Sequence, residues 1–212
     1  MGNPRVNVYR IQLVLFFKEN VDFKAFGLTG SLYNNLKEKS TTEPQTIPAS
    51  EGMPDDFPRC IWNDSNFNLT FTKVRLDFSF NLLPDEDWNE KLSELKKYII
   101  DSIYDQKIVI DRVGCVAEMS IEGNLHEKLN HVVTIGNFNN ASECNISWLE
   151  RQEYYNIWNY YNIIDNEMEN KIVFDINSLP DYKLSNQGIT VDQAIEQVIK
   201  ILKGKMQNVC IF

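Results

Sequence analysis

The first half of this chain alternates between two kinds of hydrophobic periodicity, and the order of these patterns constrains the fold more than any other feature. Residues 5–17 carry apolar side chains at every second position, which is typical of a β-strand. Residues 85–105 carry them three and four positions apart, the pattern of a core-facing helix, and Asp85 is placed to cap it. We predict the remaining elements of this half as a weaker helix over 21–37 and strands over 59–63, 67–82 and 108–121.

These elements follow one another as strand, helix, strand, strand, helix and strand, the order of a ferredoxin-like split βαβ sandwich. Within 67–82 the apolar positions change parity. Phe71 shares a face with the residues before it, whereas Val74 falls on the opposite face. We therefore expect either a β-bulge near Thr72 or a strand whose buried face changes partners along its length. Residues 39–58 hold four of the seven prolines and form a long loop, which is a functional flap, a disordered segment or a surface-packed connection.

The second half is predicted to be a β-hairpin followed by a helix. Residues 146–164 are rich in aromatic side chains and Asn, which favours one long strand, and 171–177 alternate as its returning partner. The sequence therefore predicts the α+β class, with antiparallel twisted sheets and helices packed on one side. Residues 1–122 form the split βαβ half and 123–212 form the hairpin and helix half, either as separate units or as one continuous domain.

The C-terminal helix is predicted over 191–203, where apolar residues again recur three and four positions apart. Thr190 and Gln193 form a capping box at its start. Gly204 marks its expected end, because glycine commonly follows the last turn of a helix.

The order of these last elements resembles a sporadically distributed bacterial α+β family of unknown function. The resemblance includes the segment at 174–177, which reads Phe-Asp-Ile-Asn, and the approach to the central strand at 54–59. It implies the α+β architecture, and it implies neither catalytic residues nor a role.

Charge and composition exclude several classes of protein. The formal net charge is −9, and no segment gathers basic residues, so a duplex nucleic-acid partner is not expected. The apolar run at 13–17 is far below the ~20 residues that cross a membrane, and the N-terminus lacks a secretory signal. We expect a cytoplasmic protein without a membrane partner. In that reducing compartment four cysteines would be free thiols, namely Cys60, Cys115, Cys144 and Cys210.

Signatures of catalysis are missing from the chain. Its two histidines, His126 and His131, are five residues apart, so a regular helix would point them about 140° away from each other. They could not share one metal ion in that arrangement. The glycine-rich phosphate loops and the G-x-S-x-G nucleophile motif are also absent. We therefore expect neither a metal nor a cofactor, and we favour the interpretation that this protein is not an enzyme.

Two acidic residues nevertheless interrupt apolar strands, Asp77 and Asp111, with Arg75 and Arg112 close to them in sequence. The favoured interpretation is a structural ion pair that fixes strand register. The alternative is a small hydrolase or nucleotide-processing enzyme, in which the carboxylates act beside an arginine that holds an anion.

Aromatic side chains concentrate in one predicted strand, at Trp148, Tyr154, Tyr155, Trp158, Tyr160 and Tyr161. Because neighbouring positions are aromatic, a strand with one face in water would expose some of these rings, and exposed aromatic patches mark contacts. The other interpretation is a strand covered on both faces. We favour a non-enzymatic protein that binds a protein partner, or itself, through this region, through the loop over 39–58, or through both. A third possibility is an acidic inhibitor of a basic partner such as a nuclease.

Overall fold

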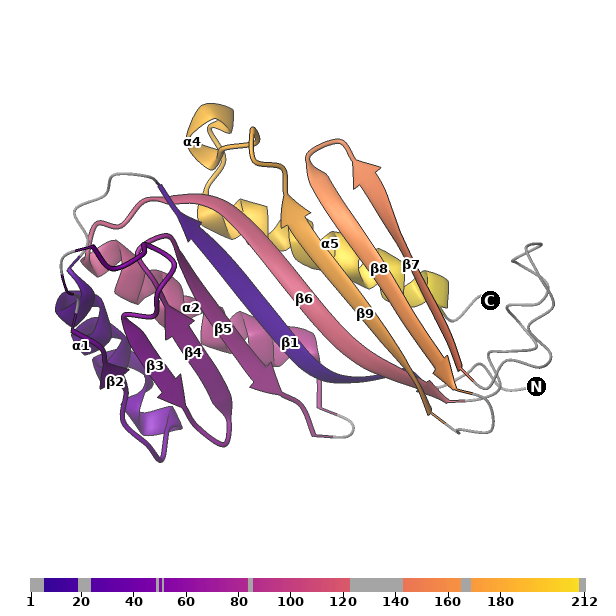
Figure 1. Ribbon diagram of the computed structural model, residues 1–212, viewed down its shortest axis with the longest axis horizontal. Helices are drawn as coiled ribbons and strands as arrows, with labels where there is room; N and C mark the ends of the chain where they lie inside the picture. Colours follow the sequence, from indigo (N-terminus) through magenta and orange to yellow (C-terminus); the bar gives the residue numbers. More distant parts are fainter. Residues whose placement is uncertain are drawn as a thin grey trace.

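The computed structural model describes a single antiparallel sheet of nine strands in the order β2-β3-β4-β5-β1-β6-β9-β8-β7 (Figure 1). The described residues are 6–18, 24–48, 50, 52–83, 86–122, 143–164 and 169–209. The strands are β1 (Val6–Phe17), β2 (Gln45–Thr46), β3 (Cys60–Asn63), β4 (Phe67–Phe71), β5 (Arg75–Asn81), β6 (Ile110–Glu122), β7 (Glu143–Gln152), β8 (Tyr155–Ile164) and β9 (Glu169–Ser178). The helices are α1 (Ala25–Leu36), the 3-10 turn η1 (Lys37–Lys39), α2 (Trp88–Asp105), α4 (Leu184–Gln187) and α5 (Val191–Val209).

The predicted α+β class and the split βαβ order are confirmed. The strands β4, β5, β1 and β6 lie side by side in the spatial order of that motif, and α1 and α2 are its two crossover helices. The second half adds β9, β8 and β7 to the free side of β6, so the two halves share one continuous sheet. Among the described residues, no helix is long and apolar enough to cross a membrane.

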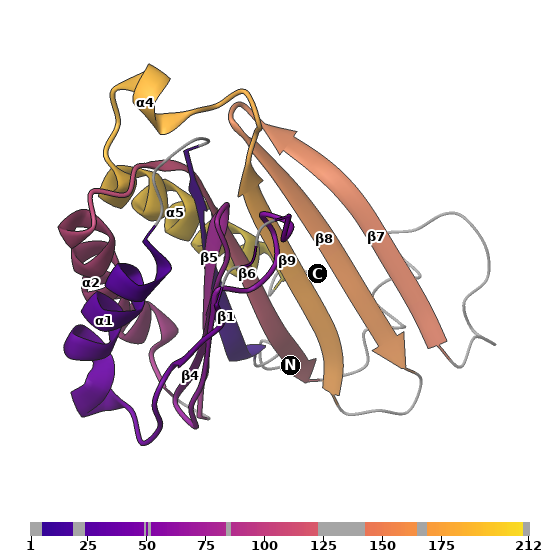
Figure 2. The same ribbon diagram turned by 60° about the vertical axis from the view of Figure 1, so that its left-hand side comes forward.

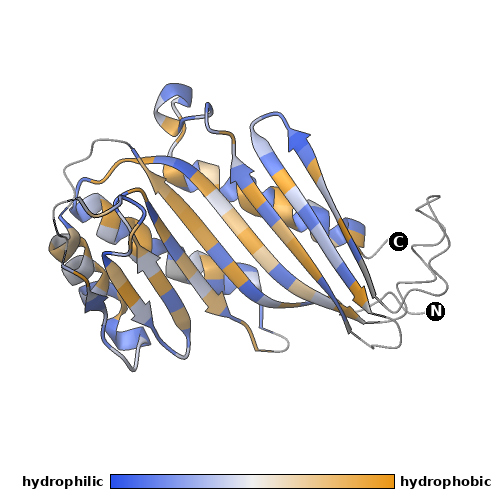
Figure 3. Cartoon of the chain, in the orientation of Figure 1, coloured by the Kyte–Doolittle hydropathy of each residue, from blue (hydrophilic) through white to orange (hydrophobic). Residues whose placement is uncertain are grey.

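All three long helices cover the same face of the sheet, which we call the helix face (Figure 2). Apolar residues predominate along the central strands, with polar residues between them (Figure 3). In β1, Ile11, Leu13 and Leu15 are buried on the helix face. The polar residues between them, such as Gln12, lie on the opposite face, which we call the open face.

Two details of the first half differ from the sequence prediction. The change of parity near Thr72 is a tight turn between β4 and β5 instead of a β-bulge, and the Thr72 amide donates to the Arg75 carbonyl across it at 2.8 Å. The cap of α2 is Asp87, whose carboxylate accepts from the backbone amides of Asn89 and Glu90. Asp85 lies outside the described residues.

Hydrogen bonds connect the loop over 39–58 to the turn between β3 and β4. The structure describes this loop apart from residues 49 and 51. The Asp64 carboxylate accepts from the Thr41 amide at 2.7 Å and from the Ser40 hydroxyl at 2.8 Å. Burial alone would raise the pKa of Asp64, but hydrogen bonds from Asn66, Thr41 and Ser40 outweigh it and lower the pKa well below its usual range. This carboxylate therefore holds the start of the loop over the buried ring of Trp62.

The second half also differs from its prediction. The stretch over 146–164 is not one strand but the hairpin of β7 and β8, which turns at Glu153 and Tyr154. The capping box of α5 is confirmed, because the Thr190 amide donates to Gln193 at 2.8 Å and the Gln193 amide donates back at 3.2 Å. Gly204 does not end the helix, which continues to Val209.

Candidate functional site

The residues of the hydrolase alternative do not form one site. Asp77 lies on the open face, where its carboxylate pairs with Arg75 at 2.8 Å and accepts from Gln12 at 3.0 Å. Asp111 is buried in a bulge of β6 and pairs with Lys183 at 3.4 Å, not with either of the two expected arginines. Each of the two carboxylates has a cation of its own, which is the arrangement of a structural ion pair.

Arg112, the last of these candidates, makes a contact of a different kind. Its guanidinium lies over the ring of Phe16, with 4.3 Å between the guanidinium carbon and the ring centroid. The ring separates Arg112 from Arg75, because Phe16 of β1 pairs with both residues. The two arginines therefore flank an aromatic ring instead of converging on an anion.

No metal site and no reactive thiol is found among the side chains that the structure describes, which do not include that of Cys144. No group of three or more His, Cys, Asp or Glu side chains gathers there in a way that could hold a metal ion. His126, His131 and Cys210 lie outside the described residues. Cys60 and Cys115 are free and buried, as expected, and burial raises the pKa of Cys115 to about 12. Such a thiol stays protonated and is a poor nucleophile.

The aromatic hairpin lies at the outer edge of the sheet. β7 is the last strand, and among the described residues nothing pairs with its outer side (Figure 1). Between 146 and 152 this strand has no proline and no lysine, the residues that most commonly protect sheet edges, and its charged residues are Glu150 and Arg151. The hairpin therefore presents a row of backbone amides and carbonyls that another strand can pair with.

The open face of the hairpin carries an exposed apolar cluster. Leu149 of β7 pairs with Trp158 of β8, and their side chains are 40% and 38% exposed. Tyr160, two residues further along β8, is 41% exposed, and its ring stacks on Trp158 with the centroids 6.0 Å apart. Side chains of this size and exposure at a sheet edge are typical of contact surfaces.

The helix face of the hairpin is only partly covered. Trp148 is 42% exposed there, and its ring stacks on Tyr161 with the centroids 5.2 Å apart. Tyr161 itself is half-buried, and desolvation raises its pKa to about 12. The edge strand thus has an exposed tryptophan on the helix face as well as the apolar cluster on the open face.

The two tyrosines at the turn belong mainly to the fold. Tyr155 is buried, its hydroxyl donates to Gln197 of α5 at 2.8 Å, and burial raises its pKa to about 12. The ring of Tyr154 stacks on Tyr182 at 4.2 Å, and the Tyr154 carbonyl accepts from the Leu179 amide at 2.9 Å. Four of the six aromatic residues are exposed, and of these Tyr154, at 37%, is held in the turn by the contacts above. The exposed aromatic residues on the two faces of the strands are Trp148, Trp158 and Tyr160.

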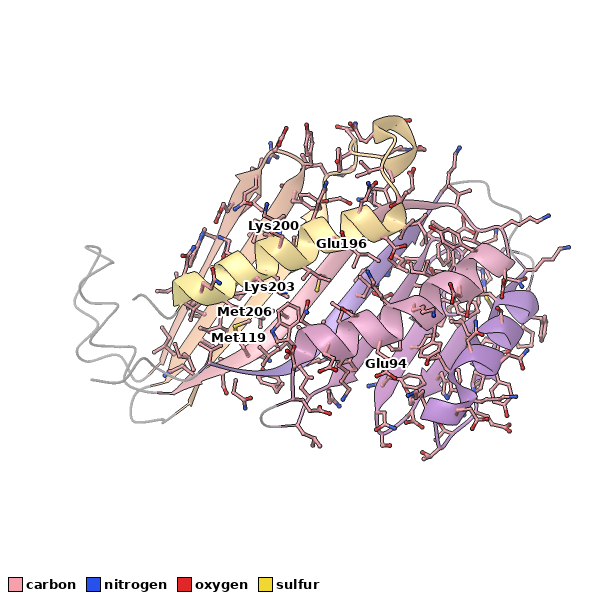
Figure 4. The ribbon with its side chains drawn as sticks, turned by 180° about the vertical axis from the view of Figure 1, so that it is seen from behind. Glu94, Met119, Glu196, Lys200, Lys203 and Met206 are labelled. Atoms are coloured by element: carbon pink, nitrogen blue, oxygen red, sulfur yellow. The ribbon has the colours of Figure 1, made fainter. Side chains whose placement is uncertain are left out.

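A cavity of about 510 Å³ lies between the turn end of β7 and helix α5. Glu150 of β7 lines it, as do Lys200, Gly204 and Lys205 of α5. Lys205 forms an ion pair with Glu150, and its hydrogen bond lowers the pKa of that carboxyl. Figure 4 shows Lys200 on the edge of α5 toward β8 and β7, opposite the edge that carries Lys203. The cavity therefore opens on the same face as Trp148.

Sequence reasoning found the aromatic residues but missed Leu149 and the cavity. One signal for the cavity was present, since Gln197, Lys200, Gly204 and Asn208 recur three and four positions apart in α5 and form a second stripe on that helix. Gly204 was instead interpreted as the end of the helix. A comparison with protein-family models and with curated proteins finds no match to this chain.

Proposed function

We propose that this protein is a non-enzymatic interaction module that binds a protein strand along the edge of β7. The observation that carries this proposal is the combination of an edge strand whose outer side no described residue pairs with and exposed aromatic residues on both faces of its hairpin. An added strand gains main-chain hydrogen bonds from the edge, and side chains on alternate positions give specificity. Trp148, Trp158 and Tyr160 would supply the apolar contacts.

A cytoplasmic location fits this proposal. Buried free thiols such as Cys60 and Cys115 persist in a reducing compartment. The hydrolase alternative gains no support from the geometry, because Asp77 and Asp111 are each engaged by a nearby cation. An acidic inhibitor would bind through charge and would lose its partner in salt, whereas binding through the aromatic edge resists salt.

Affinity capture from the native host tests the proposal. The bait is the full chain, compared with Leu149→Lys at the edge and with Phe26→Lys, a control at a 72% exposed position on α1. We expect the wild type and Phe26→Lys to retain the same protein, whether another protein or further copies of this chain, and Leu149→Lys to lose it. Equal retention by all three baits would contradict the proposal, as would a monomeric wild type that retains nothing.

A further inference from the structure

We propose that the strand added to β7 is β7 of a second copy of this chain, paired antiparallel about a two-fold axis at Leu149. This inference rests on the proposed function and names its partner. It makes the interface isologous, so that every contact occurs twice and each surface must complement itself.

The direction of the backbone groups in β7 permits this pairing. Gln152 and Tyr155 enclose a two-residue turn and therefore form a hydrogen-bonded pair. Such pairs alternate along an antiparallel ladder, so Trp148 and Glu150 also direct their backbone groups toward β8. The amides and carbonyls of the residues between them, including Leu149, consequently point outward to the free edge.

The exposed apolar side chain of β7 sets the register. β7 runs from Glu143 to Gln152, and Leu149 is 40% exposed on its open face. A two-fold axis at Leu149 covers this side chain with its own copy. Antiparallel pairing about this residue places Trp148 opposite Glu150 of the partner subunit and Ser147 opposite Arg151 of the partner subunit.

On the helix face, this register brings each exposed tryptophan to a cavity. Glu150 lines the cavity of about 510 Å³ beside α5. Trp148, placed opposite Glu150 of the partner subunit, lies at the mouth of that subunit's cavity. Ile201 and the bare backbone of Gly204 offer apolar surface there, and a cavity of this volume is in the range that accommodates an aromatic ligand. Each subunit thus supplies one ring and receives one.

On the open face, the same register joins the two apolar clusters. Leu149 meets its own copy, with Trp158 beside it on each side of the axis. Arg151 is exposed and makes no ion pair or hydrogen bond with the residues that the structure describes. Opposite the small Ser147 of the partner subunit, Arg151 comes within reach of the Tyr160 ring that pairs with that serine. A guanidinium over a tyrosine ring is a favourable contact.

Local charge also allows two copies of an acidic chain to meet at this edge. The whole chain carries a net charge of −9, which opposes association. Within 146–152, however, the only charged residues are Glu150 and Arg151, and Glu150 is paired with Lys205. The two copies would therefore meet through a stretch that is close to neutral.

Cysteine cross-linking tests the pairing and its register. In a background with Cys144→Ser and Cys210→Ser, we introduce Leu149→Cys or, as the matched control, Ser147→Cys. Residues that form a hydrogen-bonded antiparallel pair have Cα atoms about 5.5 Å apart, which suits a disulfide. We expect oxidised Leu149→Cys to form a covalent dimer in high yield, Ser147→Cys to remain monomeric under denaturing conditions, and a mixture of Ser147→Cys with Arg151→Cys to cross-link.

Light scattering on the uncross-linked protein supplies the second measurement. We expect a mass of about twice 24.7 kDa for the wild type and 24.7 kDa for Leu149→Lys. Cross-linking of Ser147→Cys in place of Leu149→Cys would overturn the register. A monomeric wild type that still captures another protein through Leu149 would overturn self-pairing and leave the proposed function intact. If Leu149→Lys alters neither the mass nor the captured protein, both proposals fail.

Discussion

The open face of the sheet is polar over its centre and aromatic over its edge. At the centre, Glu118 of β6 pairs with Arg10 of β1 at 2.9 Å and with Lys171 of β9 at 2.9 Å. At the edge, the corresponding surface of β8 carries Trp158 and Tyr160. A polar open face is what an antiparallel sheet with helices on one side normally presents to water. The aromatic edge departs from that pattern, and the proposed interface would cover it.

On the helix face, too, aromatic rings are buried in the first half of the sheet and partly exposed at the hairpin of β7 and β8. Under α1 and α2 the aromatic side chains are fully covered, as for Trp62 and Phe78. At β7 the cover is incomplete, and Trp148 stays exposed. Large side chains of this protein are therefore buried where helices cover the sheet. The exposed rings of the hairpin are therefore a local feature of the edge.

The largest expected effect comes from truncating a ring in each region. Phe78→Ala removes a side chain that contacts the rings of Phe67 and Phe80, and we expect it to lower the free energy of unfolding by about 3–5 kcal/mol. Trp158→Ala should cost about 1 kcal/mol or less, because its ring is exposed. Urea unfolding in a Leu149→Lys background measures both without a contribution from association. Equal losses would show that Trp158 belongs to the core.

The next largest effect concerns the loop over 39–58, which Asp64 holds against the turn between β3 and β4. Asp64→Ala removes a carboxylate that accepts hydrogen bonds from Ser40 and Thr41, and we expect a loss of about 1–2 kcal/mol because the carboxylate is only partly buried. The pKa of Asp64 is lowered in the folded protein, so its contribution is present above the pKa of the unfolded chain, about 3.9, and is lost as the pH falls through the folded value.

Unfolding of the wild type and Asp64→Ala at several pH values checks this expectation. Their difference should be full at about pH 6 and should shrink below about pH 4. Asp55→Ala is the control, since its ion pair with Lys73 is well exposed and should contribute little at any pH. A difference for Asp64→Ala that grows on acidification would contradict the assignment.

The sequence predicts the strands and helices of this fold better than the turns that connect them. Periodicity identified the strands and helices of the first half, because each buried face follows the period of its element. The two hairpin turns were missed, since neither Lys73-Val74 nor Glu153-Tyr154 contains a residue that favours turns. Glu153 adopts a φ of 25°, in the left-handed region that glycine prefers, and strand pairing and the contacts of Tyr154 hold it there.

The missed turn explains why the candidate site was only half predicted. Aromatic composition located the region, but the face on which each ring lies depends on where the chain turns. With one long strand over 146–164, Trp148 and Trp158 would share a face. With the turn at Glu153, they lie on opposite faces of the sheet. The cavity beside Glu150 is lined by the last turns of α5, as far as Asn208. The sequence prediction ended this helix at Gly204 and therefore left out part of the cavity wall.

A smaller effect distinguishes Tyr155, which belongs to the fold, from Tyr160, which belongs to the contact surface. Tyr155→Phe removes the hydrogen bond to Gln197, and we expect it to lower the free energy of unfolding by about 1 kcal/mol. Tyr160→Phe is the matched control at an exposed position, and it should leave stability unchanged. Urea unfolding of the two variants checks the difference. If Tyr160→Phe were the more costly change, the assignment of Tyr155 to the fold and Tyr160 to the contact surface would be reversed.

The smallest effect on stability is expected for Gly204→Ala, a substitution that also changes the cavity beside α5. Gly204 lies inside α5 with nothing within 4 Å of an added Cβ, so Gly204→Ala should raise the stability of the single chain by about 0.5–1 kcal/mol. Its methyl group would also narrow the cavity that receives Trp148, and we expect it to weaken self-association. Gly30→Ala, at an equally open position in α1, should give the same gain in stability without that change. Sedimentation of both variants across a range of concentrations measures the association, and an unchanged dimer of Gly204→Ala would exclude the cavity as the site that receives the ring.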